Sequence, residues 1–182
     1  MPTIQTTTLG GGCFWCLESA LKQLRGVENA ESGYANGDHP SPSYELVCKG
    51  DTGHAEVVRV TFDSEIISFR QILEVFFALH DPTQLNRQGN DIGTQYRSGV
   101  YYHDDLQKEI AEQLLTEINQ TEIWPVPTVT EVLEVSNWHK AEDYHQDYFK
   151  NNPQNMYCNM VVAPKLKKFK QTFADFLKTS TQ

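Results

Sequence analysis

The chain has 182 residues, enough to bury a substantial hydrophobic core within one domain. Charged residues make up 21% of it and hydrophobic residues 39%, which excludes a disordered or collagen-like chain. The net charge of -9 argues against nucleic acid or an anionic membrane as the main partner.

The N-terminal residues and the cysteines indicate the compartment in which the protein works. Residues 1–8 contain neither a basic cluster nor an apolar run of signal-peptide length, and 18 consecutive apolar residues occur nowhere. We therefore expect a cytoplasmic protein. Its four cysteines, at positions 13, 16, 48 and 158, point to metal, redox or nucleophilic chemistry rather than to a secreted disulfide framework.

The first helix is expected to begin directly after Cys13. Three glycines, Gly10–Gly12, let the backbone turn tightly, and apolar residues then recur at helical spacing from Phe14 until Gly26, a natural helix end. Unpaired amide N–H groups and the positive end of the helix dipole favour a thiolate at this position by about 0.3 to 1 kcal/mol. The thiolate is the nucleophilic form of cysteine, so Cys13 is the first candidate catalytic residue.

Two aromatic residues and a second cysteine follow Cys13. Phe14 and Trp15 would border the sulfur with large apolar rings, which suit a small apolar group better than a charged one. Cys16 lies three residues after Cys13 on the same helix face, within reach of a disulfide. Small buried cysteines and core aromatic residues would give the same pattern, but the glycine run favours the catalytic interpretation.

The remaining chain alternates between short strands and helices, without an internal repeat or a long linker. Strand-like patterns cover residues 27–34, 54–63, 100–102 and 128–135, and also Tyr44–Cys48. Helical patterns cover residues 66–80, 104–120, 141–150 and 164–178. Turn-rich or polar loops are expected over residues 36–42, 83–98 and 151–158.

Glu56 is a candidate acid in the strand 54–63. Alternation along this strand places it on the apolar face, where desolvation would raise its pKa and keep it protonated near neutral pH. A carboxylate at the rim of the sheet, turned to water or paired with Arg59 or His54, is equally compatible with the strand pattern.

Polar residues in the loops are further candidates. Tyr44 follows a turn-rich loop and would either line a site or cap that loop. Asp91 and Tyr96 are the best candidates for placed hydrogen-bonding groups in a polar loop of more than ordinary length, a kind that is often functional. The last loop delivers Tyr157 and Cys158.

Three separated motifs together resemble the A-type peptide methionine sulfoxide reductases: GGCFW at 11–15, GHAE at 53–56 and GNDIGTQYRS at 89–98. The resemblance runs from about residue 9 to residue 158. It implies an α+β fold, a ferredoxin-like two-layer sandwich in which helices cover a mixed sheet and long loops carry the function. The chain 1–182 would then be a single catalytic domain whose C-terminal tail carries an amphipathic helix over 164–178.

The resemblance also assigns roles to the candidate residues. It implies that Cys13 attacks the sulfoxide sulfur while Phe14 and Trp15 hold the S-methyl group of the substrate. It further implies that Glu56 protonates the sulfoxide oxygen and that the hydroxyls of Tyr44 and Tyr96 hydrogen-bond this oxygen. Asp91 would be a supporting carboxylate linked through water. Tyr157 would lie beside the substrate, and Cys158 would be the resolving cysteine.

The implied chemistry is the reduction of the S epimer of methionine sulfoxide, free or in proteins. Because a sulfoxide is a poor electrophile until its oxygen is protonated, attack by a thiolate needs an acid and hydrogen-bond donors on the oxygen side. Release of methionine leaves Cys13 as a sulfenic acid, which a second thiol condenses into a disulfide. A dithiol protein such as thioredoxin would reduce this disulfide, and no metal or other cofactor is expected.

The sequence departs from many members of this family at Cys16, where they carry a small residue without a thiol. No cysteine follows Cys158. Either Cys158 or Cys16 can therefore resolve the sulfenic acid. We expect Cys48 to be a structural thiol and the protein to be a monomer.

Two other functions could use the same cysteines. A general dithiol–disulfide oxidoreductase would act through Cys13 and Cys16, but it leaves the candidate acid and tyrosines without a role. A non-enzymatic zinc module would bind the metal through Cys13, Cys16, Cys48 or Cys158 together with His54.

Overall fold

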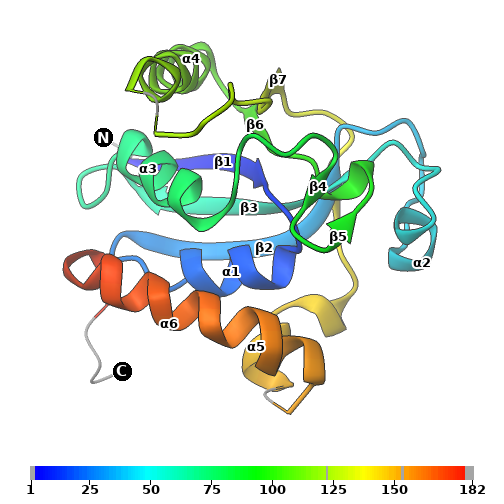
Figure 1. The fold of residues 1–182 in the computed structure, drawn as a ribbon. Helices are drawn as coiled ribbons and strands as arrows, with labels where there is room; N and C mark the ends of the chain where they lie inside the picture. Colours follow the sequence, from blue (N-terminus) through cyan, green and yellow to red (C-terminus); the bar gives the residue numbers. More distant parts are fainter. Residues whose placement is uncertain (1–2, 122, 153, 179–182) are drawn as a thin grey trace.

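A six-stranded mixed sheet forms the centre of the fold in the computed structural model, which describes residues 3–121, 123–152 and 154–178 (Figure 1). The strands are Ile4–Gly10 (β1), Val27–Ala35 (β2), Ala55–Asp63 (β3), Gly99–Tyr102 (β6), Glu131–Glu134 (β7) and His139–Lys140 (β8). Their order across the sheet is β7-β6-β1-β3-β2-β8. β6 and β7 pair in parallel, and the other neighbours pair antiparallel.

Two helices complete a ferredoxin-like arrangement. α1 (Phe14–Leu21) connects β1 to β2, and α3 (Phe69–Leu79) lies between β3 and β6 in the chain. The central elements therefore follow the order βαββαβ, with β6-β1-β3-β2 side by side in the sheet. This confirms the expected α+β fold, which β7 and β8 extend by one strand on either side.

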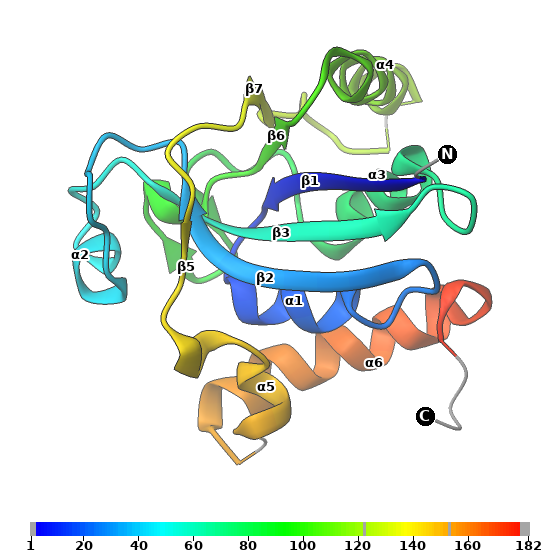
Figure 2. The same ribbon diagram turned by 180° about the vertical axis from the view of Figure 1, so that it is seen from behind.

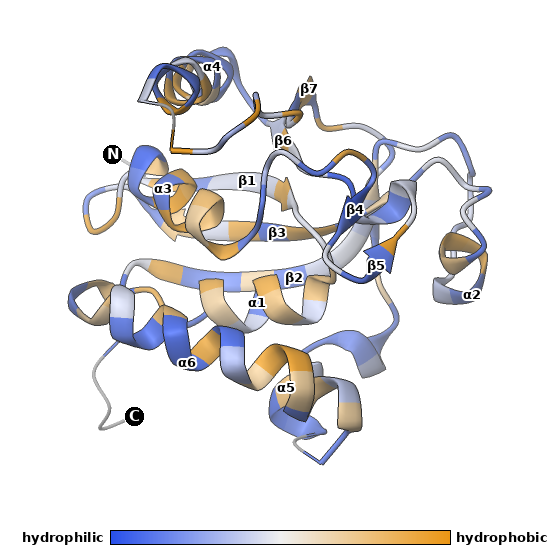
Figure 3. Cartoon of the chain, in the orientation of Figure 1, coloured by the Kyte–Doolittle hydropathy of each residue, from blue (hydrophilic) through white to orange (hydrophobic). Residues whose placement is uncertain are grey.

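The core lies between the sheet and these helices. In Figure 1, α1 and α3 stand in front of the strands, and in Figure 2, seen from behind, the strands stand in front of both helices. α6 (Ala163–Thr172) packs against α1 and buries Leu166 and Phe169. Figure 3 shows hydrophilic and hydrophobic residues alternating along α6, as expected for an amphipathic helix at the surface. α4 (Asp105–Thr121) packs against α3 and β7.

The ends of α3 follow from its local sequence. The Ser68 hydroxyl accepts a hydrogen bond from the Gln71 N–H at 3.0 Å, and the Gln71 side chain accepts one from the Ser68 N–H at 2.9 Å, which forms a capping box. The helix ends before His80, whose backbone is extended, two residues ahead of Pro82. Between these ends the helix buries Phe69, Ile72, Leu73, Val75, Phe76 and Phe77.

The segment Tyr44–Cys48 is a short helix, α2, and the expectation of a strand is wrong. The Ser43 hydroxyl caps this helix by accepting a hydrogen bond from the Leu46 N–H at 3.3 Å. The cap satisfies one backbone donor locally, which favours a helical turn over strand pairing. α2 lies apart from the sheet, next to the loop that precedes β3 (Figure 1).

The expected helix 141–150 is interrupted. A 3₁₀ turn, Asp143–His145, and α5 (Tyr148–Asn151) flank Asp147, whose φ of 55° is left-handed and incompatible with a continuous right-handed helix. The expected C-terminal helix is also divided, because a 3₁₀ turn over Ala174–Phe176 follows α6.

The long loop 83–98 contains a small hairpin of β4 (Arg87–Gln88) and β5 (Asp91–Ile92), followed by a 3₁₀ turn over Thr94–Tyr96. None of the helices in the described parts of the chain combines the length and the apolar character needed to cross a lipid bilayer.

Candidate active site

Cys13 is the N-cap residue of α1, as the sequence predicts. The preceding Gly12 has a φ of 83°, a conformation that favours glycine, and its N–H donates to the carbonyl oxygen of Tyr96 at 3.3 Å. A Cβ atom on Gly11 would lie only 3.0 Å from the ring of His80. The glycines therefore let the turn before Cys13 pass close to the end of α3.

Glu56 reaches the same helix N-terminus from β3. Its Oε1 accepts a hydrogen bond from the Phe14 N–H at 3.2 Å, whereas its Oε2 has no hydrogen-bond partner among the described residues. Burial raises the pKa of Glu56 to about 8, the bond from Phe14 opposes this, and the charge of Asp91 adds to it. At neutral pH Glu56 is therefore a protonated acid, next to the residue that follows Cys13.

The thiol of Cys13 does not have the lowered pKa that its place at a helix N-terminus suggests. Burial raises its pKa well above the usual value, and the charges of Glu56 and Cys16 raise it further. A backbone hydrogen bond from Trp15 lowers it, but by less. The expectation of a stabilised thiolate is wrong for this structure, because desolvation outweighs a helix-dipole effect of about 1 kcal/mol.

Two tyrosine hydroxyls lie near Glu56. Tyr44 comes from α2 and Tyr96 from the turn after β5, and burial followed by the charge of Glu56 raises the pKa of both. Both hydroxyls are therefore neutral hydrogen-bond donors. The Tyr44 ring stacks on Phe14, with ring centroids 6.4 Å apart and planes at 17°. Burial raises the pKa of the Cys48 thiol at the end of α2, and hydrogen bonding with the Tyr44 side chain opposes this.

Trp15 is enclosed by side chains from the C-terminal part of the chain. Its ring stacks on Tyr148, with centroids 3.9 Å apart and planes at 7°, and Tyr157 meets it edge-on at 5.7 Å. Its indole N–H donates to Nδ1 of His145 at 3.0 Å. The rings of Phe14 and His145 also lie 5.1 Å apart. An aromatic wall therefore stands beside the nucleophile candidate.

Asp91 and Tyr157 form a direct link between two distant segments. The Tyr157 hydroxyl donates to Oδ2 of Asp91 at 2.6 Å. Burial raises the pKa of Tyr157, and the charge of Cys13 raises it further. The hairpin that carries Asp91 and the segment before Cys158 therefore meet close to Cys13.

All four cysteines are free thiols. Cys13 and Cys16 line one small cavity between α1 and α6, together with Lys165 and apolar side chains. Burial raises the pKa of Cys16 to about 11, the charge of Lys165 opposes this, and Asp91 and Cys158 raise it further. Cys158 is fully buried. Cys16 therefore interacts electrostatically with both other candidate redox cysteines.

The described residues offer no set of ligands for the alternative function as a zinc module. Within residues 3–121, 123–152 and 154–178, no group of three or more His, Cys, Asp or Glu side chains is arranged to hold a metal ion. The ring of His54 instead holds the loop 36–42 in place. Its Nδ1 accepts a hydrogen bond from the Gly37 N–H at 3.2 Å, and its Nε2 lies 2.9 Å from the His39 carbonyl oxygen.

Comparisons with known proteins support the family resemblance that the motifs around Cys13, Glu56 and Asp91 indicate. Residues 5–177 match the family model described as peptide methionine sulfoxide reductase. The chain belongs to this family. The peptide methionine sulfoxide reductase MsrA of Polynucleobacter asymbioticus is 51% identical over 177 residues, which cover 97% of this chain and 93% of the relative.

Solved structures share the fold. Mxr1 from Saccharomyces cerevisiae in reduced form has a TM-score of 0.80 and 38% identity, over 86% of this chain and 90% of that chain. Mxr1 in complex with Trx2 has a TM-score of 0.58 and 26% identity, over 80% and 85% of the two chains.

Four further residues complete the site, and no sequence motif marks them: Tyr34, Glu142, His145 and Tyr148. Glu142 holds two segments together, since its Oε1 accepts from the Tyr34 hydroxyl at 2.7 Å and its Oε2 from the Tyr44 N–H at 2.9 Å. About a hundred residues separate these partners. For His145 and Tyr148 the signal in the sequence is the aromatic composition of the segment 141–150, whereas Tyr34 and Glu142 carry none.

Proposed function

We propose that this chain reduces the S epimer of methionine sulfoxide, free or in proteins, to methionine, with Cys13 as the nucleophile. The observation that carries this proposal is the meeting of Cys13 and Glu56 at the N-terminus of α1, where Glu56 Oε1 lies 3.2 Å from the Phe14 nitrogen. A neutral acid beside a thiol supplies the proton that the sulfoxide oxygen needs during attack. Membership of the reductase family supports the same reaction.

The first step transfers the sulfoxide oxygen to Cys13. As the Cys13 sulfur attacks the substrate sulfur, Glu56 protonates the sulfoxide oxygen and the S–O bond of the substrate is replaced by one on Cys13. Methionine sulfur gains two electrons and Cys13 loses two, which leaves methionine and a sulfenic acid. The thiol proton of Cys13 restores the acid form of Glu56, so atoms and charge balance.

The surrounding residues bind the substrate in this proposal. Phe14 and Trp15 hold its S-methyl group, which suits the apolar aromatic wall. Tyr44 and Tyr96 donate hydrogen bonds to its oxygen, in keeping with their neutral hydroxyls near Glu56.

The substrate-binding role of Tyr157 and the supporting role of Asp91 fit the bond between them. We infer that Asp91 orients the Tyr157 hydroxyl at one side of the pocket. A water molecule linked to Asp91 can then assist the hydroxyls on the sulfoxide oxygen.

Recycling uses the remaining cysteines and a thioredoxin. The Cys16 thiol attacks the sulfenic acid of Cys13, releases water and forms a disulfide, which the dithiol of thioredoxin reduces by exchange. The cavity shared by Cys13 and Cys16 favours this route over direct attack by Cys158, which is fully buried. Cys158 then serves as the second thiol behind Cys16. The structure of the similar protein Mxr1 in complex with Trx2 supports thioredoxin as the reductant.

The organisation of the protein follows from the same proposal. We infer one catalytic domain over 1–182, with a core of about 9–158 and an amphipathic helix in the tail, because one hydrophobic cluster joins Leu9 to Phe169. The protein would act as a cytoplasmic monomer without a metal or another cofactor, and without a nucleic acid or membrane partner.

The test is stereospecific reduction by the purified chain. With a dithiol reductant, chiral analysis should find the S epimer of methionine sulfoxide consumed and the R epimer left, and Cys13→Ser should abolish turnover and the trappable sulfenic acid. Activity that survives Cys13→Ser would overturn the proposal. Reduction of insulin disulfides at a comparable rate would favour the general dithiol–disulfide oxidoreductase instead.

The recycling route has its own test. Cys16→Ser and Cys158→Ser should both release one methionine per enzyme in a single turnover, because neither thiol takes part in the first step. With thioredoxin, we expect Cys16→Ser to lose turnover more severely than Cys158→Ser. Full thioredoxin-driven turnover in both variants would refute the relay.

A further inference from the structure

Asp147 adopts a strained conformation at the back of the aromatic wall. Its φ of 55° and ψ of 33° are left-handed, which is uncommon for a residue with a side chain. It lies between His145, which accepts the indole hydrogen bond of Trp15, and Tyr148, which stacks on the Trp15 ring. Such strain persists only where the surroundings hold it, and it concentrates at functional sites.

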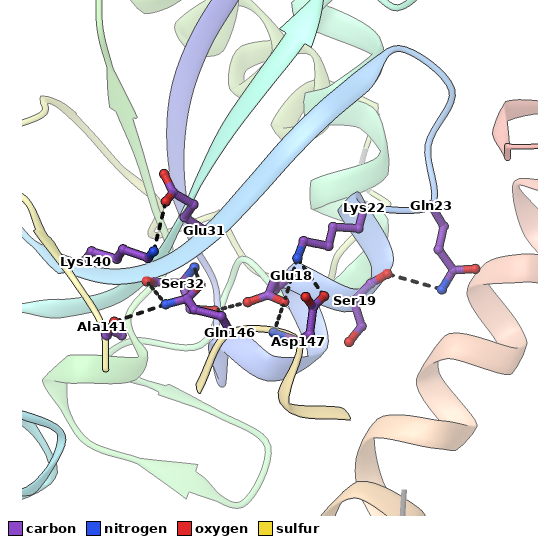
Figure 4. A network of polar contacts seen from close by, with 10 residues as sticks. All are labelled: Glu18, Ser19, Lys22, Gln23, Glu31, Ser32, Lys140, Ala141, Gln146 and Asp147. Carbon is purple, nitrogen blue, oxygen red and sulfur yellow. Dashed lines mark hydrogen bonds and ion pairs between the residues drawn. The ribbon is translucent and has the colours of Figure 1, made fainter. Parts of the chain in front are cut away.

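A buried carboxylate of α1 holds this turn. Glu18 is 1% exposed, and its Oε2 accepts a hydrogen bond from the Asp147 N–H at 2.7 Å (Figure 4). Its Oε1 accepts from the Ser32 hydroxyl at 2.7 Å, which anchors the same carboxylate to β2. Lys22 reaches both acids, at 2.6 Å from Oδ1 of Asp147 and 3.5 Å from Oε2 of Glu18.

The neighbouring Gln146 fixes the segment to β2. Its side-chain oxygen accepts from the Ser32 N–H at 3.0 Å, and its side-chain nitrogen donates to the carbonyl oxygens of Ser32 at 3.0 Å and Ala141 at 3.1 Å. These contacts fix the extended residue before the turn. The carbonyl oxygen of Asp147 accepts from the Asn151 N–H at 3.0 Å, whereas its N–H bonds only Glu18 among the described residues. The N–H of the left-handed residue therefore depends on one acceptor, the buried carboxylate.

We infer that Glu18 is a positioning residue of the substrate pocket, which fixes the Asp147 turn and thereby the His145–Tyr148 side of the Trp15 wall. The inference rests on the proposed function, in which Trp15 holds the S-methyl group. α1 carries Cys13, Trp15 and Glu18 together. The same helix thus fixes the position of the nucleophile and, through Glu18, the positions of the rings that enclose Trp15.

A burial argument favours positioning over a purely stabilising role. Taking a carboxylate out of water is costly, and burial raises the pKa of Glu18 accordingly. An apolar side chain would fill the same space without that cost, but it could not accept the hydrogen bond of Asp147. The nearby pair Glu31–Lys140, 3.5 Å apart and partly exposed, offers a matched carboxylate that has no contact with the aromatic wall (Figure 4).

The experiment is a single-turnover assay of methionine sulfoxide reduction by the full chain at increasing substrate concentration. Glu18→Leu fills a similar volume but has no atom that can accept the Asp147 N–H. We expect the half-saturating concentration to rise about fivefold or more, with the maximal rate within about twofold, because the wall and not the nucleophile is disturbed. Glu31→Leu should leave both parameters unchanged.

A rescue separates positioning from general destabilisation. In Glu18→Leu, the added substitution Asp147→Gly should recover at least half of the lost affinity, since glycine adopts the left-handed conformation without a side-chain penalty. Acrylamide quenching of Trp15 fluorescence, measured in a Trp124→Phe and Trp138→Phe background, should increase in Glu18→Leu and fall back to its original level when Asp147→Gly is added.

The outcomes are distinct from those that test the proposed function. If the unaltered chain reduces the sulfoxide through Cys13 but Glu18→Leu keeps its half-saturating concentration, the inference alone fails. It also fails if the maximal rate falls and the affinity does not. Should Glu18→Leu not fold, Lys22→Met, which removes the ion pairs of Lys22 with Asp147 and Glu18, must raise the half-saturating concentration about twofold, or the inference is wrong.

Discussion

Replacing Glu56 by glutamine tests the acid at the centre of the proposed reaction. Glu56→Gln keeps an oxygen that can accept the Phe14 N–H, as Oε1 does at 3.2 Å, but the amide cannot give up a proton. General acid catalysis contributes about 10² to 10⁴ in rate, which is about 3 to 5 kcal/mol of the barrier. We expect the single-turnover rate of methionine release to fall by this factor at pH 7.

The pH dependence of that loss follows from the raised pKa. Because burial raises the pKa of Glu56 to about 8, the unaltered enzyme holds the proton below this pH and loses it above. The ratio of the unaltered rate to the Glu56→Gln rate should therefore stay constant up to about pH 8 and then shrink about tenfold per pH unit. Taking the ratio reduces the contribution of the Cys13 ionisation, because burial is the largest cause of its raised pKa and acts in both proteins.

The same pKa predicts that the acid destabilises the fold in alkaline solution. Above its ordinary pKa of 4.5 the unfolded chain releases this proton, while the folded chain keeps it up to about pH 8. Folding stability therefore falls as pH rises through this window, by about 1.4 kcal/mol per unit, or about 3 kcal/mol at pH 7. Glu56→Gln removes this penalty, so urea unfolding should find its relative stability increasing from pH 5 to pH 8.

Two results would refute the reasoning about Glu56. An unchanged single-turnover rate in Glu56→Gln would remove the residue from the role of acid. A rate ratio that stays constant up to pH 10, together with a stability difference that does not depend on pH, would mean that Glu56 is not protonated in the folded protein.

Three further changes have defined outcomes. Tyr96→Phe should slow single-turnover reduction about 100-fold, because one donor to the developing charge is lost, and an effect below threefold would exclude this role. Lys165→Met should slow alkylation of Cys16 at pH 8, measured by mass spectrometry, by about threefold or more, because the charge of Lys165 lowers the pKa of Cys16. Lys167→Met, on the same helix, should leave this rate unchanged. Equal alkylation rates in the Lys165→Met variant and the unaltered chain would contradict the charge interaction in the shared cavity. Leu73→Ala should lower the free energy of unfolding in urea by about 2 to 5 kcal/mol, because Leu73 is fully buried in α3, and a loss below 1 kcal/mol would contradict its place in the core.

The sequence by itself determined the frame of the fold and the centre of the site. Local periodicity identified the helix that begins after Cys13 and the strand that buries Glu56, because both depend on neighbours within a few residues. Short motifs around Asp91 and Tyr96 identified the family, since their spacing is fixed within one loop. The C-terminal end of α3 also followed from the proline at position 82, whereas the expected helix 66–80 began three residues before the observed start at Phe69.

Tertiary structure decided how these parts interact. The pKa of Cys13 depends on burial by distant segments, so helix position alone predicted its direction wrongly. The left-handed Asp147 interrupts the expected helix 141–150, and the carboxylate that holds it, Glu18, lies 129 residues away. Contacts of this kind leave no periodic trace, because they join single residues of ordinary type. Desolvation and long-range hydrogen bonds exist only once the chain has brought such residues together.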